Sequence, residues 1–178
     1  MTTAPISKKT ESLKRDLFSN DASVVMKALI KCREQGTPQV VEPLIALYSS
    51  STDDAVKEEI SDMLCNLKVS GLATVFVNAL TNNEYLKVRK DILAFMWNSA
   101  IQPVDGMVEI TDVAIEGTFE ETLECFTLLE SMEDEIPEDI LTESIYRVRE
   151  HLGKSEGTRE QRALLNEYLN ALEARQQN

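Results

Sequence analysis

The sequence repeats about every 32 residues, and each repeat has the pattern of two amphipathic helices. Apolar residues at i, i+4 and i+8 line one face of an α-helix. A fixed period of roughly 20–50 residues indicates stacked repeats, in which each unit buries its apolar face against its neighbours. Three sets of residues mark the period: Val24, Val56 and Val88; Ala28, Ile60 and Ile92; Cys32, Leu64 and Met96. The pattern predicts an all-α chain, arranged as a short α-solenoid of about four stacked helical hairpins.

Turn and capping residues place the expected boundaries. We expect a tail and a short helix over residues 1–20, with residues 1–9 loose, then repeats over 21–153 and a capping helix over 154–178. The hairpins are expected to open at Asn20-Asp21, Thr52-Asp53, Asn83 and Thr118, and the last helix at Thr158, where Thr158 and Gln161 have the spacing of a capping box. The first helices of these hairpins are expected to end at Gly36, Ser70-Gly71, Ala100 and Met132, and the later turns to fall at Pro103, Gly117, Pro137 and Gly153.

Composition favours a soluble cytoplasmic protein. The longest uninterrupted apolar run, Ile92 to Trp97, is far shorter than the roughly 20 residues that cross a bilayer. The basic residues near the N-terminus are not followed by an apolar stretch of the kind found in secretory signals. Three scattered cysteines, Cys32, Cys65 and Cys125, are typical of buried thiols in a reducing compartment rather than of a disulfide framework.

The segment Asp21-x-x-Val24-x-x-x-Ala28-Leu29 is followed by Pro43-Leu44-Ile45-x-Leu47, and a later helix contains Val88-Arg89-x-x-Ile92. These segments resemble HEAT-like (armadillo-type) repeats: the first two are similar to the first and second helices of that family, and the third to its frequent Val-Arg pair. The period is shorter than in long HEAT units, and the Trp, Leu-Gly and Tyr signature of tetratricopeptide repeats is missing. The resemblance implies a right-handed stack whose second helices line a concave side, and a role in protein–protein contact.

The negative charge of the chain is concentrated in one block. The net charge is −13, yet residues 91–146 contain 15 Asp and Glu and no Lys or Arg, whereas the segments on either side are each close to neutral. Carboxylates at i, i+4 in a helix repel one another by roughly 0.2–0.5 kcal/mol per pair, and interleaved lysines would remove that cost. The block therefore has two interpretations: a solvated face, or a surface that attracts a basic partner and repels nucleic acid.

Helical spacing places the carboxylates of this block on the exposed side of two second helices. We predict a partner-binding stripe, with the tyrosine as its aromatic anchor, made of Asp105, Glu109, Asp112, Glu116, Asp139, Glu143, Tyr146 and Glu150. The expected partner is a basic or amphipathic segment of another protein, with no nucleic acid and no membrane bound.

The sequence contains no pattern that indicates catalysis. His151 is the single histidine, and we expect it to interact with carbonyl groups at a helix C-terminus. The spacing of an EF-hand, of a di-iron carboxylate site and of a phosphate-binding glycine loop is missing, so no catalytic, cofactor-binding or metal residue is predicted. Trp97 is expected to pack against the adjacent repeat. Our hypothesis is a non-enzymatic protein–protein interaction module. The alternatives are a HEAT-like enzyme, a small-molecule or pigment-handling protein, and a purely structural accessory subunit.

Overall fold

The computed structural model is all-helical over the residues it describes, which are 8–35, 37–68, 70–154 and 156–177. This confirms the predicted all-α class. The α-helices are α1 (Lys8–Leu17), α2 (Ala22–Gln35), α3 (Val41–Ser50), α4 (Asp54–Asn66), α5 (Leu72–Leu80), α6 (Arg89–Asn98), α7 (Met107–Glu116), α8 (Phe119–Ser131), α9 (Glu138–Gly153) and α10 (Arg159–Gln176). Short 3₁₀ segments precede three of them: η1 (Pro38–Val40), η2 (Asn83–Val88) and η3 (Val104–Gly106).

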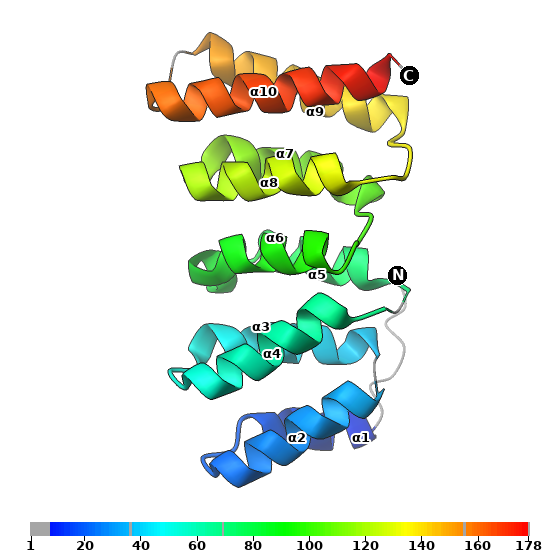
Figure 1. Cartoon of the computed structure of the whole chain (residues 1–178), viewed down its shortest axis with the longest axis vertical. Helices are drawn as coiled ribbons and strands as arrows, with labels where there is room; N and C mark the ends of the chain where they lie inside the picture. The colour runs from blue at the N-terminus through cyan, green and yellow to red at the C-terminus, as the bar shows by residue number, and fades with distance from the viewer. Residues whose placement is uncertain (1–7, 36, 69, 155, 178) are drawn as a thin grey trace.

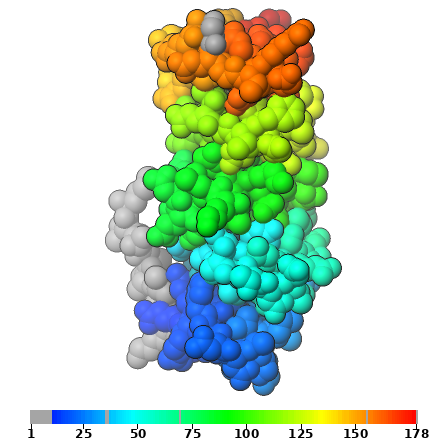
Figure 2. All heavy atoms as spheres, turned by 90° about the vertical axis from the view of Figure 1, so that its left-hand side faces the viewer, coloured from blue at the N-terminus to red at the C-terminus, as the bar shows by residue number. Residues whose placement is uncertain are grey.

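The helices form two layers (Figure 1). The odd-numbered helices pack in order along one layer, and the even-numbered helices pack in order along the other. Each odd helix also contacts the even helix that follows it. The chain therefore advances along the long axis one helix pair at a time, as the colour order from blue to red in Figure 2 shows. α1 with α2 and α9 with α10 are the two ends of the stack.

The residues that mark the 32-residue period form the centre of the core. Eight of the nine are buried, and Val24 is half-buried. They lie on α2, α4 and α6, except Val88, the last residue of η2. Burial of such a continuous apolar face is the main stabilising term for helices of this length, because isolated helices of 10 to 14 residues are marginal in water.

Two predicted boundaries were wrong, each for a local reason. α4 ends at Asn66 rather than at Ser70-Gly71, and the Asn66 carboxamide donates a 2.8 Å hydrogen bond to the carbonyl oxygen of Asp62 in the last turn. The expected helix from Asn83 to Ala100 starts as the 3₁₀ segment η2. In a 3₁₀ helix residues i and i+3 share one side, so Tyr85 and Val88 both point into the core.

The predicted N-caps of α2 and α4 are present. The Asp21 carboxylate accepts a hydrogen bond from the Ser23 N–H, and the Asp53 carboxylate accepts from Ala55 and Val56. At α10 only half of the predicted capping box forms: the Thr158 hydroxyl accepts from the Gln161 N–H, while the Gln161 side chain bonds elsewhere. A complete box occurs instead at α8, between Thr118 and Glu121.

The N-terminal region differs from its expected form in two details. The prediction of a loose segment over residues 1–9 lies mostly outside the described residues, and α1 already begins at Lys8. Pro43, which was expected to bend a helix, lies in the first turn of α3 because η1 delays the start of that helix to Val41. A proline there removes no intrahelical hydrogen bond. Among the described residues, no helix has the length and apolarity needed to cross a membrane.

Candidate functional site: grooves on the odd layer

Seven of the eight residues of the predicted stripe line two separate grooves on the odd layer. Asp112, Glu116, Glu143, Tyr146 and Glu150 line a groove between α7 and α9. Asp105 and Glu109 line a smaller groove between α5 and α7. Asp139, an exposed residue in the first turn of α9, lines neither. Most of the stripe is thus brought together, but not as one continuous surface.

The groove between α7 and α9 has a volume of about 790 Å³. One wall comes from the last turns of α7, where Asp112 and Glu116 follow one another at i, i+4. The other wall comes from the exposed side of α9. Glu156 and Gly157 of the turn before α10, and Gln161 in the first turn of α10, also line the groove. This groove is open and polar, which suits an extended or helical peptide better than a small apolar ligand.

Arg147 crosses the groove and joins its two walls. Its guanidinium forms two hydrogen bonds to the Asp112 carboxylate on α7, at 2.6 and 2.8 Å, and one to Glu143 on its own helix at 2.7 Å. These hydrogen bonds raise the pKa of Arg147 above its ordinary value, and the bonds to Asp112 have the larger effect. Asp112 and Glu143 are therefore already paired in the folded chain.

The remaining groove side chains are more accessible. Tyr146 is 60% exposed, the most exposed large hydrophobic side chain among the described residues. Glu150 pairs with Lys154 at 2.9 Å, and both residues line the groove. Within the described residues Asp105, Glu109, Glu116 and Asp139 form no ion pair. The stripe carboxylates available to a partner are thus Glu116 inside this groove and Asp105, Glu109 and Asp139 beyond it.

The smaller groove, of about 220 Å³, lies where η3 approaches α5. Asp105 is on η3 rather than on α7, so the helical spacing that linked it to Glu109 does not extend to it. Gly106 permits the close contact, because a Cβ atom at that position would lie 2.5 Å from Cγ2 of Val77. Thr74 and Asn78 of α5 supply neutral polar groups to the opposite wall.

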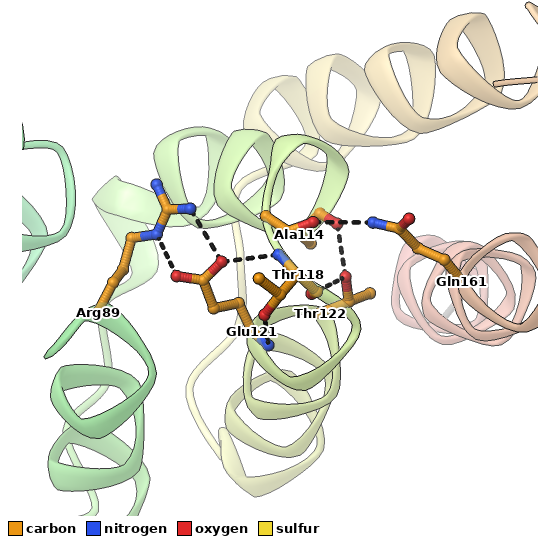
Figure 3. Close-up of polar contacts among 7 residues, drawn as sticks. Arg89, Ala114, Thr118, Glu121, Thr122 and Gln161 are labelled. Atoms are coloured by element: carbon orange, nitrogen blue, oxygen red, sulfur yellow. Dashed lines mark hydrogen bonds and ion pairs between the residues drawn. The ribbon is translucent and has the colours of Figure 1, made fainter. Parts of the chain in front are cut away.

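A chain of polar contacts fixes the end of the larger groove (Figure 3). The Gln161 amide on α10 donates a 2.8 Å hydrogen bond to the Gly117 carbonyl oxygen between α7 and α8. The Thr122 hydroxyl donates to the Ala114 carbonyl oxygen of α7. Glu121 accepts from the Thr118 N–H and pairs with Arg89 of α6. The groove is therefore built on a turn that three neighbouring helices hold in place.

The Arg89–Glu121 pair is partly enclosed, with side chains that are 16% and 7% exposed. Burial by itself would raise the pKa of the Glu121 carboxyl. The hydrogen bonds from the Arg89 guanidinium and from the Thr118 backbone outweigh burial and hold that pKa below its ordinary value. The same contact with Glu121 raises the pKa of Arg89. Both groups stay charged at neutral pH.

The cysteines, the histidine and the acidic clusters are the remaining titratable groups of interest. Among them, no group of three or more His, Cys, Asp or Glu side chains is placed to hold a metal ion. Burial raises the pKa of Cys32 to about 11 and raises that of Cys125 further, so both thiols stay protonated at neutral pH. Cys65, predicted to be buried, is half-buried, and its pKa is also raised by burial. His151 lies in the last turn of α9, as expected, and lines the larger groove.

Sequence reasoning missed the cations of the groove. The charge count ended the acidic block at residue 146, one position before Arg147. A signal for Arg147 was present in its position four residues after Glu143, and the same holds for Lys154 after Glu150. Trp97 does pack as predicted, since its indole N–H donates a 2.8 Å hydrogen bond to Glu124 of α8.

No protein-family model matches the chain, and no curated protein matches it.

Proposed function

We propose that the chain is a non-enzymatic protein–protein interaction module that binds a basic or amphipathic segment of another protein along the odd layer. On this proposal the helix pairs are HEAT-like repeats, the protein is cytoplasmic, and the groove between α7 and α9 is the centre of the binding surface. The proposal needs no cofactor and no metal.

One observation carries the proposal: an exposed aromatic side chain lies in a groove that is lined by five carboxylates and only two basic side chains. Tyr146 projects beside Asp112, Glu116, Glu143 and Glu150. Aromatic side chains surrounded by polar groups are common anchors at protein interfaces, because they bury a large area at a low entropic cost. Carboxylates around such an anchor favour association with a lysine- or arginine-containing segment and accelerate the encounter.

The test uses charge reversals that leave the internal ion pairs intact. A variant with Glu109→Lys, Glu116→Lys and Asp139→Lys changes three carboxylates that have no ion-pair partner among the described residues. The matched control reverses Glu130, Glu160 and Glu167, which are exposed on the even layer and change the net charge by the same amount. The probe is a fluorescent lysine-rich amphipathic peptide, with binding measured by anisotropy near ~0.15 M salt.

We expect the odd-layer variant to bind the peptide at least about tenfold more weakly than wild type, mainly through slower association. The even-layer control should bind like wild type. An equal loss of peptide affinity in both variants would mean that only net charge matters. Wild-type affinity in both variants would mean that the stripe is a solvated face and not a binding surface. Circular dichroism checks that each variant is folded. Tyr146→Ala should weaken binding through faster dissociation.

Arg147 gives a second test with the opposite sign. Arg147→Met releases the Asp112 and Glu143 carboxylates from their internal partner. If the groove binds cations, the variant should bind the basic peptide several-fold more tightly, even though its fold loses one exposed ion-pair network. Weaker binding would show that Arg147 itself contacts the partner.

The same proposal predicts that the protein does not bind duplex DNA at physiological salt. Phosphate contacts need a basic surface, and each groove of the odd layer contains more carboxylates than basic side chains. Micromolar affinity for a random duplex near ~0.15 M salt would contradict this and would favour a HEAT-like enzyme that acts on nucleic acid.

A further inference from the structure

The side of α2 that faces away from the core carries two large apolar residues. Met26 is 38% exposed and Ile30 is 52% exposed, one turn apart on the helix. The opposite side of α2 packs into the core through Val25, Leu29 and Cys32. Exposed apolar residues that occur singly are common on protein surfaces. Two on one helix face indicate an interaction site when the charges around them are complementary to those of a partner.

The fold does not require apolar residues at these two positions. One period later, on α4, the equivalents of Met26 and Ile30 are Glu58 and Asp62, and both are exposed. α2 and α4 occupy neighbouring places in the same layer. The same structural positions are therefore apolar on α2 and charged on α4.

The charges around Ile30 are arranged with opposite signs on its two sides. Lys27 lies three residues before it and Glu34 four residues after it, and both are exposed. At roughly 100° per residue, these three side chains fall within an arc of about 60° on the face opposite the core. Among the described residues neither Lys27 nor Glu34 forms an ion pair. The Lys27 and Glu34 positions are therefore complementary to each other when this face is turned by 180°. Two further exposed cations border the arc: Lys31, and Arg33, which is paired with Glu59 and Asp62 of α4.

We propose that this face binds a second copy of the chain, with the two α2 helices packed antiparallel about a two-fold axis near Ile30. In that arrangement Lys27 of one copy meets Glu34 of the other, and the reverse pair forms at the same time. Met26 and Ile30 of both copies supply the apolar centre. An isologous contact of this kind closes after two copies and does not build fibres.

The position of the face in the stack supports a second copy as its occupant. Residues 91–146 carry the excess negative charge, and α2 is at the other end of the molecule (Figure 1). Two copies joined through α2 keep their acidic halves far apart, so their mutual repulsion is weak. One helix face per copy is smaller than a standard interface, so the dissociation constant should be on the order of tens of micromolar.

The first test is the dependence of mass on concentration, measured by sedimentation velocity with the full chain from about 1 to 500 μM. We expect a monomer at the low end and a dimer at the high end. Ile30→Asp, which introduces the residue found at the equivalent position of α4, should weaken dimerisation at least about tenfold without loss of helicity. A wild-type chain that stays monomeric over the whole range overturns the proposal.

A charge swap identifies the face and the antiparallel arrangement. Lys27→Glu alone and Glu34→Lys alone each bring like charges together twice and should each weaken the dimer several-fold. The double variant Lys27→Glu with Glu34→Lys restores both pairs and should recover the wild-type association. Failure of the double variant to recover overturns the antiparallel α2 contact. The odd-layer variant Glu109→Lys, Glu116→Lys and Asp139→Lys serves as a control and should dimerise like wild type. If that variant alone loses association, the self-contact uses the acidic grooves and the proposal is wrong.

Discussion

The half of the molecule built from α1–α5 and the half built from α6–α10 hold their helices together in different ways. All five buried polar residues of the described chain, Ser99, Thr111, Glu121, Thr122 and Ser144, follow α6 in the sequence. Between helices of the first half, the ion pairs are exposed: Arg33 on α2 reaches Glu59 and Asp62 on α4. Between helices of the second half, buried bonds occur, such as that between Thr111 on α7 and Tyr168 on α10.

The difference shows how an acidic segment can still form a specific helix stack. The second half contains most of the acidic block, and its repeat pattern is less regular than that of the first half. Apolar packing fixes which face is buried but tolerates sliding and rotation, whereas a buried hydrogen bond is costly to leave unmade. We infer that the second half uses buried polar contacts to fix the register that its sequence pattern specifies weakly.

The largest expected effect comes from breaking the enclosed ion pair of the second half. Glu121→Ala removes the partner of the Arg89 guanidinium and also one side of the α8 capping box. Leaving a largely buried charge unpaired should lower the free energy of unfolding by roughly 3 kcal/mol. Urea unfolding followed by circular dichroism measures it. The matched change in the first half, Glu59→Ala, breaks an exposed pair and should cost only ~0–1 kcal/mol. Similar losses in the two variants would remove the distinction between the halves.

The same pair predicts an acid dependence that belongs to the second half. The pKa of Glu121 is held below its ordinary value of 4.5, so its contribution to stability is complete above the unfolded-state pKa. That contribution is lost as the pH falls through the lower, folded-state pKa. Glu121→Gln should therefore show a shallower loss of stability than wild type below about pH 4.5, in urea titrations at a series of pH values. Parallel curves for Glu121→Gln and wild type would show that Glu121 does not contribute to the acid dependence of stability.

A smaller loss is expected at the contact between α7 and α10. Tyr168→Phe removes the hydroxyl that lies 3.1 Å from the Thr111 hydroxyl, both side chains being fully buried. Thr111 keeps its bond to the Met107 carbonyl oxygen, so no donor is left unpaired. The variant should lose about 1 kcal/mol of unfolding free energy, the usual net value of one hydrogen bond. A loss below the error of the urea titration would show that this bond does not help to fix α10.

The smallest expected effect has the opposite sign. The Ser144 hydroxyl on α9 is buried and has no hydrogen-bond partner among the described residues. Ser144→Ala removes that unpaired group and favours the helix, so unfolding free energy should rise by roughly 0.5–1 kcal/mol. Thr122→Ala is the contrasting control, because the Thr122 hydroxyl donates to Ala114 and should be costly to remove. Destabilisation by Ser144→Ala would indicate a partner that the fold places near this hydroxyl.

The sequence by itself determined the helical class, the order of the helices and most of their buried faces. The 32-residue period places one core face on α2, α4 and α6 because burial needs a match between apolar spacing and 3.6 residues per turn. It also located N-caps at Asp21 and Asp53, since capping depends only on residues a few positions apart. The excess of carboxylates over residues 91–146, and Tyr146 at the end of that block, were equally visible from composition and spacing.

Only the tertiary structure decided which polar groups are partners. Arg147 binds Asp112, 35 residues earlier, and Arg89 binds Glu121, 32 residues later, because neighbouring helices place these side chains opposite one another. The Gln161 side chain bonds to Gly117 rather than completing its own capping box for the same reason. Periodicity predicts which side of each helix is buried, but not the rotation and height at which two helices meet. Those two quantities divide the predicted stripe into two grooves and leave Glu116 available while Asp112 is paired.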